Sequence, residues 1–274
     1  MAYTLSTNLN SNKLIISQKG KFKSVKEIFK LSDNKPIVIA GPCSIENYNR
    51  LDKIAKLLKE VGVKCIRGGA YKPRTSPYDF QGLGEDGLKI LNEVAEKYGL
   101  LAITEVVDTR HVELVSKYVS ILQIGSRNMD NYELLKEVGN AKNTVMLKRG
   151  FSATINEFML AAEYIAKNGK NNIILCERGI RTFETKTRNT LDISCIPIIK
   201  LETNLPIIVD LSHSLGRKDI VYPIAKAVIA VGGDGIMIEV HPDPNSALSD
   251  NEQQMNVSEF KEFMDKFENG FLRC

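Results

Sequence analysis

Six basic side chains lie within or just after short apolar segments of this 274-residue sequence and could together bind anionic groups. They are Arg67, Lys72, Arg74, Arg127, Lys148 and Arg178. Arginine binds phosphate and carboxylate groups through two parallel N–H donors, and lysine supplies a compact positive charge. So many cations in one cavity would need anions to neutralise them, which predicts a doubly charged substrate or two substrates. The alternative is that single cations pair with carboxylates such as Glu105 or Asp210.

Four further residues carry groups that bind metal ions. They are Cys43, His213, Glu239 and Asp250. A thiolate, an imidazole and two carboxylates suit a transition ion such as Mn²⁺, Fe²⁺ or Zn²⁺ better than Mg²⁺. Because these residues lie far apart in the sequence, spacing alone leaves alternatives open. Cys43 would then be a small core residue and His213 a hydrogen-bonded loop residue.

Two other histidines are less informative. His241 precedes the turn-forming segment PDP, and it is either a loop anchor or a catalytic group. His111 stands where a helix is expected to start. We expect it to be exposed and assign it no role.

The elements that must position these side chains are eight apolar runs, each followed by a polar turn and a helical segment. The runs are PIVIAG (36–41), KCIRGG (64–69), LAITEV (101–106), ILQIGS (121–126), TVMLKR (144–149), NIILCE (172–177), LPIIVD (205–210) and GIMIEV (235–240). Such runs are typical of strands buried on both faces of a parallel sheet. Helical periodicity predicts helices over 50–61, 86–98, 109–117, 132–138, 155–168, 219–231 and 257–267. The segment 189–200 is less regular because Pro197 interrupts it.

Eight strand–helix units fit either a doubly wound open sheet or a closed barrel. The open sheet usually has a glycine-rich phosphate turn after its first strand, whereas the first run here ends in GPCS. The sequence therefore favours an α/β fold, a single-domain (β/α)8 TIM barrel over residues 36–274. Residues 1–35 form a short N-terminal extension, in which 14–22 is expected to be a hairpin under the barrel floor. The carboxyl ends of all eight strands then meet at one face, where the polar residues named above would gather.

Composition narrows the classes of function. The 37 Lys and Arg residues exceed the 33 Asp and Glu residues by only four, which is too mild an excess for a nucleic-acid partner. No apolar run approaches the ~20 residues needed to cross a membrane, and the N-terminus lacks a signal-peptide pattern. Five widely spaced cysteines without a CxxC pair do not indicate a disulfide framework. We therefore expect a cytoplasmic protein with no nucleic-acid or membrane partner.

Seven motifs, read in order from about Pro36 to the C-terminus, resemble one enzyme family. They are IAGPCSIEN, RGGAYKPRTSPYDFQGLG, QIGSRNM, VMLKRG, ILCERGIRTFE, VDLSHSLGR and IMIEVHPDPNSALSDNEQQ. The pattern is similar to the class I 3-deoxy-D-arabino-heptulosonate 7-phosphate (DAHP) synthases, in the short subfamily shared with 3-deoxy-D-manno-octulosonate 8-phosphate synthase. The resemblance implies that phosphoenolpyruvate condenses with erythrose 4-phosphate and releases phosphate, which is the first step of the shikimate route to chorismate and the aromatic amino acids. The alternative is the octulosonate enzyme, which uses arabinose 5-phosphate.

The resemblance also implies roles for residues at matching positions. One divalent metal ion is assigned to Cys43, His213, Glu239 and Asp250; Mn²⁺ is expected, with Fe²⁺, Zn²⁺ and Co²⁺ as alternatives. Phosphoenolpyruvate is assigned to Arg67, Lys72, Arg127, Lys148 and Arg178, and erythrose 4-phosphate to the loop residues Lys72, Pro73, Arg74, Thr75 and Ser76. In the implied mechanism the metal polarises the aldehyde oxygen, and Glu105 positions or deprotonates the water that adds to the enol carbon. Lys72 protonates the new alkoxide, and neighbouring cations are expected to lower its pKa.

Two departures from related families refine the expectation. The octulosonate synthases carry an Asn-Arg-Ser type sequence where this chain has Pro-Arg-Thr-Ser, which favours the four-carbon aldose. Some of them replace the thiol ligand by asparagine and work without metal, so Cys43 indicates metal dependence. A non-catalytic relative on the same barrel would be expected to lose some matched positions, and none is lost here.

Relatives often carry a regulatory or chorismate mutase domain before the barrel, where this chain has only the extension 1–35. We therefore expect no intrinsic feedback inhibition. By resemblance we expect a homo-oligomer, either a tetramer or a dimer. A chorismate mutase acting in trans is a further candidate partner.

Overall fold

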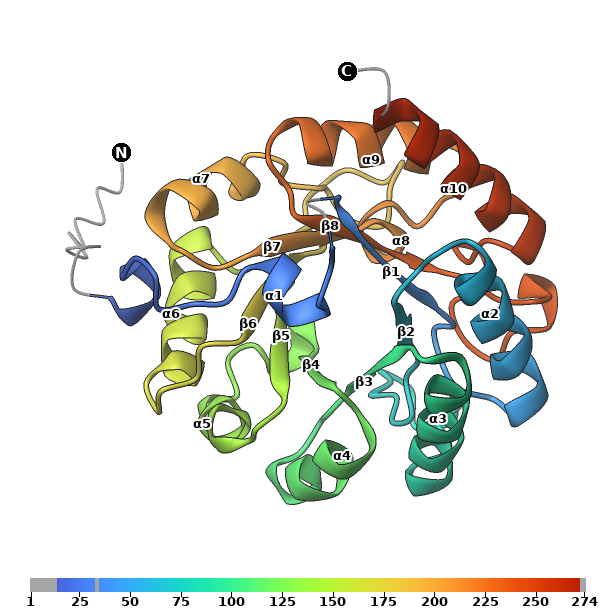
Figure 1. Cartoon of the computed structure of the whole chain (residues 1–274), viewed down its shortest axis with the longest axis horizontal. Coiled ribbons are helices and arrows are strands. Elements are labelled where there is room, and N and C mark those ends of the chain that lie inside the picture. Colours follow the sequence, from blue (N-terminus) through green and yellow to red (C-terminus); the bar gives the residue numbers. More distant parts are fainter. Residues whose placement is uncertain (1–13, 33–34, 272–274) are drawn as a thin grey trace.

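Eight parallel strands form a closed barrel in a computed structural model that describes residues 14–32 and 35–271 (Figure 1). Each strand pairs with the next along the chain, and β8 pairs with β1 to close the barrel. The strands are β1 (Ile37–Gly41), β2 (Cys65–Arg67), β3 (Leu101–Glu105), β4 (Ile121–Ile124), β5 (Thr144–Lys148), β6 (Ile173–Glu177), β7 (Ile207–Asp210) and β8 (Gly235–Glu239). All eight predicted strands are present, and the (β/α)8 prediction is confirmed.

Helices surround the barrel and cover the outer face of its strands (Figure 1). They are α2 (Tyr48–Glu60), α3 (Glu85–Tyr98), α4 (Val112–Tyr118), α5 (Tyr132–Asn140), α6 (Ile155–Ala166), α7 (Cys195–Glu202), α8 (Leu211–Leu215), α9 (Val221–Ala230) and α10 (Val257–Phe271). Short 3₁₀ turns are η2 (Ile15–Ser17), η3 (Thr109–His111), η4 (Ser126–Asn128) and η5 (Pro244–Ser246). Within the described residues, no helix is both long and apolar enough to span a membrane.

Two helices differ from the expectation for local reasons. Pro197 lies in the first turn of α7, where a missing N–H costs no helical hydrogen bond, so the helix simply begins at Cys195. The five-residue helix α8 was not predicted, because it is too short to show a helical period. It begins where the Asp210 carboxylate accepts a hydrogen bond from the backbone N–H of His213, and it ends at Gly216.

The side chains of the strands alternate between the barrel interior and the helical layer. Ile39, Cys65, Ile103, Ile121, Met146, Ile174, Ile208 and Met237 form the apolar cluster inside the barrel. Two positions further along, the next inward-facing residues are polar on most strands. They are Arg67, Glu105, Gln123, Lys148, Asp210 and Glu239, all buried. Because side chains along a strand alternate between the two faces, the inward-facing layer nearest the carboxyl ends of the strands is mostly polar.

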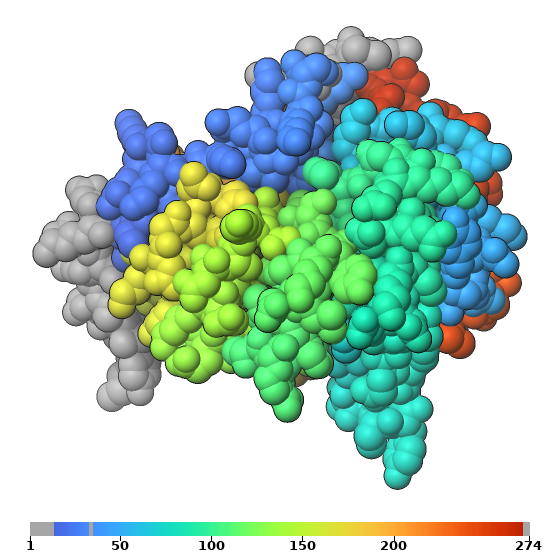
Figure 2. Space-filling view, turned by 60° about the horizontal axis from the view of Figure 1, so that its bottom comes forward, coloured from blue at the N-terminus to red at the C-terminus, as the bar shows by residue number. Residues whose placement is uncertain are grey.

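The N-terminal extension closes the opposite end of the barrel. The predicted hairpin over 14–22 is wrong: η2 occupies Ile15–Ser17, and the Glu163 carboxylate on α6 accepts hydrogen bonds from the backbone N–H groups of Ile15 and Ile16. The floor is covered instead by α1 (Val25–Phe29), whose Val25 and Phe29 join the interior cluster. Figure 2 shows the blue N-terminal segment at one end and the loop between β2 and α3 projecting from the other.

Candidate active site

A pocket of about 350 Å³ opens at the carboxyl ends of the strands. Its lining includes all six predicted cations, together with Pro73, Thr75, Glu105, His213 and Asp250. It also includes residues that the sequence reasoning did not select: Asp79, Gln123, Gly125, Ser126, Phe151, Arg181, Arg188 and Asn189. Ser76 is not among the lining residues, and its hydroxyl oxygen accepts a hydrogen bond from the backbone N–H of Tyr78 within the loop. The barrel thus brings together nearly all the predicted polar residues.

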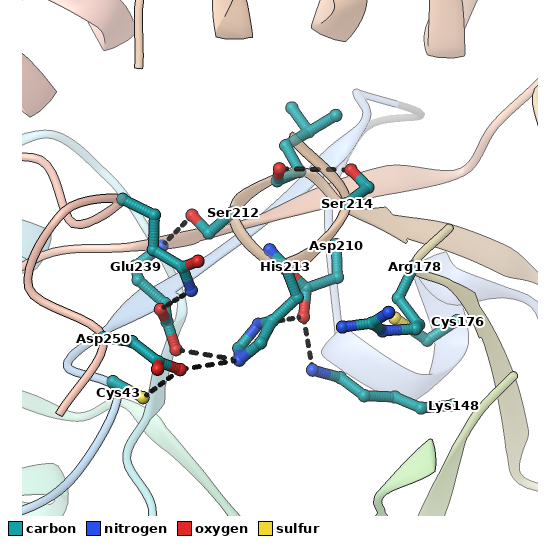
Figure 3. A network of polar contacts seen from close by, with 12 residues as sticks. Cys43, Lys148, Cys176, Arg178, Asp210, Ser212, His213, Ser214, Glu239 and Asp250 are labelled. Atoms are coloured by element: carbon teal, nitrogen blue, oxygen red, sulfur yellow. Dashed lines mark hydrogen bonds and ion pairs between the residues drawn. The ribbon is translucent and has the colours of Figure 1, made fainter. Parts of the chain in front are cut away.

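Cys43, His213, Glu239 and Asp250 converge beside this pocket, with one potential ligand atom from each lying within 4.8 Å of the others (Figure 3). The Cys43 Sγ lies 3.2 Å from Asp250 Oδ2. His213 Nε2 lies 3.5 Å from Glu239 Oε1 and 3.6 Å from Asp250 Oδ2. Such a spacing fits four ligands around one ion, and the thiolate, imidazole and carboxylate set fits a divalent transition ion.

The orientation of His213 is set by the strand end that precedes it. Asp210 Oδ2 lies 2.8 Å from His213 Nδ1, which leaves Nε2 to face the other three ligands. Burial alone would lower the pKa of His213, but the charges of Asp210 and Glu239 outweigh it and raise the pKa to about 9. Burial alone would raise the pKa of Asp210, but the charges of His213 and Lys148 hold it well below its usual value. The environment of His213 therefore favours positive charge, which a metal ion would supply.

Both carboxylate ligands are held by neighbours. Arg67 NH1 donates to Glu239 Oε1 at 2.8 Å, and Gln253 Nε2 donates to Glu239 Oε2 at 2.6 Å. Arg188 lies 3.3 Å from Asp250 and donates to the side-chain oxygen of Gln253 at 2.6 Å. Arg188 and Gln253 thus link the two carboxylates through one chain of polar contacts.

Lys72 lies between the metal ligands and the cation-lined pocket. Its Nζ is 3.0 Å from Cys43 Sγ. Burial and the charge of Arg67 act to lower the pKa of Lys72, but the Cys43 sulfur and Glu239 hold it above its usual value. The expectation of a lowered pKa is therefore wrong, because the nearest charged neighbour is a ligand sulfur and not another cation.

Four of the six predicted cations line the inner part of the pocket and divide into two groups. Arg67 pairs with Glu239, and Lys148 forms a close ion pair with Asp210, as the alternative reading of the sequence allowed. Among the described residues, by contrast, no ion pair involves Arg127, Arg178 or the newly found Arg181. Their guanidinium groups lie over the Phe151 ring, with Cζ-to-centroid distances of 5.4, 4.8 and 4.5 Å respectively. One end of the pocket therefore carries guanidinium groups that form no ion pair within the described part of the chain.

Glu105 reaches the pocket from the end of β3 and is 7% exposed. Gln123 Nε2 donates to its Oε2 at 3.4 Å. A Cβ atom at position 125 would lie 2.0 Å from Glu105 Oε1, so only glycine leaves room for this carboxylate. Its position is thus fixed by the strand and by one close backbone contact.

The other two histidines are explained by packing. His241 is buried; its Nδ1 accepts a hydrogen bond from the backbone N–H of Asp243, and its Nε2 lies 3.4 Å from Glu46. These contacts make it an anchor for the loop that carries Asp250. His111 is half-buried and stacks on Tyr71 with 4.8 Å between ring centroids, so the expectation that it is exposed is wrong.

A closed (β/α)8 barrel with a polycationic pocket at the carboxyl ends of its strands, beside four residues that could hold one metal ion, is typical of an enzyme. The family model described as the DAHP synthetase I family matches residues 13–270. The chain belongs to this family.

Known relatives agree with this assignment. A phospho-2-dehydro-3-deoxyheptonate aldolase of Thermotoga maritima is 56% identical over 227 residues, which are 83% of this chain and 67% of that protein. A crystal structure of the Thermotoga maritima aldolase, described as a DAHP synthase, superposes with a TM-score of 0.83 at 55% identity, covering 85% of this chain and 68% of that one. A truncated form superposes with a TM-score of 0.79 at 51% identity and covers 85% of each chain.

The alternative enzyme is represented by more distant relatives. A 2-dehydro-3-deoxyphosphooctonate aldolase of Fusobacterium nucleatum is 28% identical over 247 residues, covering 83% of this chain and 87% of that protein. The comparisons therefore confirm the prediction of an enzyme of the heptulosonate type over the octulosonate alternative.

Proposed function

We propose that the pocket condenses phosphoenolpyruvate with erythrose 4-phosphate and releases inorganic phosphate, as the first step of the shikimate route. One observation carries this proposal: a pocket end with unneutralised cations adjoins a cluster of ligands for one divalent ion. The cations suit a substrate that carries both a phosphate and a carboxylate, and the ion suits the carbonyl group of a second substrate.

Phosphoenolpyruvate would occupy the inner part of the pocket. Its proposed contacts are Arg67, Lys72, Arg127, Lys148 and Arg178. Arg127 and Arg178 suit the phosphate, because their charges are not neutralised by carboxylates among the described residues. Arg67 and Lys148 are already paired with Glu239 and Asp210, so they suit the single charge of the substrate carboxylate.

Erythrose 4-phosphate would lie along the loop after β2. Its proposed contacts are Lys72, Pro73, Arg74, Thr75 and Ser76. Among the described residues, Arg74 forms an ion pair only with Asp79, at 3.3 Å, and the Asp79 side chain is 45% exposed, so a phosphate could replace that partner. The Ser76 hydroxyl oxygen accepts from the backbone N–H of Tyr78, and its O–H can still donate to a phosphate.

Cys43, His213, Glu239 and Asp250 would hold the metal ion, which we propose to be Mn²⁺, with Fe²⁺, Zn²⁺ and Co²⁺ as alternatives. When bound, such an ion polarises the aldehyde oxygen as a Lewis acid. Asp210 would keep His213 in the tautomer that presents Nε2 to it, and Gln253 and Arg188 would keep the two carboxylates in place.

The chain's own residues would then guide the carbon–carbon bond. The methylene carbon of phosphoenolpyruvate attacks the aldehyde carbon, and the ammonium group of Lys72 gives a proton to the alkoxide that forms. Glu105 accepts a proton from the water that adds at the former enol carbon. The resulting phosphohemiketal collapses to the ketone: its carbon–oxygen bond to the phosphoryl group breaks, the proton of its hydroxyl group leaves with the phosphate, and proton exchange with water restores Lys72 and Glu105. Glu105 and Lys72 both line the pocket.

We further propose a homo-oligomer, either a dimer or a tetramer, located in the cytoplasm. The nearly complete exposure of Tyr78 (96%) and Phe183 (97%) supports assembly, because large aromatic side chains are favoured at interfaces. The four cysteines among the described residues are all free, which supports a reducing compartment.

Phosphate release measured with each aldose phosphate tests the reaction. We expect rapid release with erythrose 4-phosphate and phosphoenolpyruvate, release at least about 100-fold slower with arabinose 5-phosphate, and none with phosphoenolpyruvate alone. Equal rates with both sugars, or a preference for the five-carbon sugar, would contradict the proposed substrate.

A further inference from the structure

Phe151 lies at the pocket wall, three residues after the end of β5, and is half-buried. The guanidinium groups over its ring come from two different loops. Arg127 belongs to the turn after β4, and Arg178 and Arg181 follow β6. Their distances of 4.5–5.4 Å from the ring centroid are within the range of cation–π attraction.

Three like charges around one ring repel one another. Arg178 is almost fully buried, and burial together with the charge of Arg188 lowers its pKa although Asp210 opposes this shift. A carboxylate at this place would relieve the repulsion, but it would also take up the N–H donors and repel an incoming phosphate. An aromatic face attracts cations through its quadrupole and accepts no conventional hydrogen bond, so it takes up none of the guanidinium N–H donors. One N–H of Arg178 donates to the Gly179 carbonyl oxygen at 3.3 Å, and its other N–H groups can reach a ligand.

We propose that Phe151 is a positioning residue whose ring face holds Arg127, Arg178 and Arg181 ready for the phosphoryl group of phosphoenolpyruvate. This inference rests on the proposed function, because it takes that substrate as the ligand of the three arginines. It adds Arg181 and Phe151 to the substrate site. It also gives the ring an electrostatic role that an aliphatic side chain of similar volume would not have.

Three changes at position 151 separate the electrostatic role from packing. Phe151→Leu removes the aromatic face, and Phe151→Tyr keeps it. Replacement of Phe151 by 3,4,5-trifluorophenylalanine keeps the ring shape and weakens the negative face. Phe183→Leu is the matched control, because Phe183 is exposed on the same loop as Arg181 and no guanidinium group lies over it among the described contacts.

Calorimetric titration of the metal-loaded protein with phosphoenolpyruvate, without aldose, gives the dissociation constant. We expect about tenfold weaker binding for Phe151→Leu and for the fluorinated protein, and binding within about twofold of wild type for Phe151→Tyr and Phe183→Leu. In turnover assays the KM for phosphoenolpyruvate should rise by a similar factor, while kcat should change by less than about twofold.

The outcomes distinguish this inference from the proposed function. If the wild-type protein does not bind phosphoenolpyruvate, the proposed function fails. If the wild type binds it and the fluorinated protein binds it equally well, the electrostatic role of Phe151 is wrong, even if Phe151→Leu binds weakly. Should Phe151→Leu fail to fold, the fluorinated protein decides alone, because it preserves the size and shape of the ring.

Discussion

Asp210→Asn tests how the barrel holds its histidine ligand. Asp210 is fully buried, and its Oδ2 contacts both His213 Nδ1 and the Lys148 ammonium group. Asparagine has nearly the same shape, but it carries no charge and replaces one acceptor oxygen with an amide donor. Both Asp210 oxygens accept from His213, one from its backbone N–H and one from Nδ1, so the amide NH2 must face one of these donors and the pairing that fixes the imidazole is disrupted without opening a large cavity.

Two effects of this substitution on metal binding oppose each other. The charges of Asp210 and Glu239 overcome burial and raise the pKa of His213 to about 9. A metal ion binds the neutral imidazole, and a pKa of about 9 leaves His213 neutral in only about one wild-type molecule in a hundred at pH 7. Loss of this one proton should therefore raise the affinity for the metal about tenfold per pH unit up to about pH 9. Without the Asp210 charge that pKa falls and the proton competes less. Loss of the orienting hydrogen bond, however, weakens metal binding about 10- to 100-fold.

Titration of metal-free protein with Mn²⁺, followed through the electron paramagnetic resonance signal of the free ion, measures both effects. At about pH 6.5 we expect similar dissociation constants for wild type and Asp210→Asn, because the two effects nearly cancel. At about pH 8.5, where about a quarter of wild-type molecules already have a neutral His213, we expect the variant to bind about 2- to 25-fold more weakly, with a flatter dependence on pH.

The matched control is Asp192→Asn, which removes a carboxylate paired with Arg149 away from the metal ligands. It should keep the wild-type affinity and pH dependence. If Asp210→Asn also keeps both, then Asp210 does not orient His213 and the reasoning is refuted.

Two further predictions concern the same site, and a third concerns the buried ion pair between Arg149 and Glu177. A strong chelator should abolish phosphate release and added Mn²⁺ should restore it, since the four ligands suit one exchangeable ion; full activity in the chelator would contradict the metal assignment. Glu105→Gln should lower kcat about 100-fold or more with unchanged metal content, and Gly125→Ala should have a similar effect because its Cβ would displace the same carboxylate. Retained turnover in Glu105→Gln would exclude the water-activating role. Arg149→Leu should lower the free energy of unfolding by about 3–5 kcal/mol, because it leaves Glu177 buried without its cation; chemical denaturation would show this, and a loss below about 1 kcal/mol would contradict it.

The barrel could be predicted because its strands are buried on both faces and therefore read as short apolar runs. The metal ligands could not be grouped by spacing alone: Cys43 and Asp250 lie at opposite ends of the barrel sequence and meet only because β8 pairs with β1. Their prediction as one set of metal ligands therefore depended on the family resemblance.

Other features depended on contacts that no local pattern records. The predicted hairpin over 14–22 does not form, and the backbone N–H groups of Ile15 and Ile16 donate to the Glu163 carboxylate instead of to a second strand. Phe151, Arg181 and Arg188 lie in irregular loops without a period, although Arg181 falls inside the same motif that indicated Arg178. The direction of the Lys72 pKa shift depended on a sulfur atom 29 positions away in sequence.

The alternation of each strand also governs how this site can change over evolutionary time. Deleting one residue within β2 would turn Arg67 toward the helices and Ile66 toward the pocket. A deletion within β5 or β8 would likewise turn Lys148 or Glu239 away from the pocket. Insertions into the loops that follow the strands leave this alternation untouched. Changes of chain length that preserve activity should therefore accumulate in the loops, such as the one between β2 and α3, while the lengths of the strands stay constant.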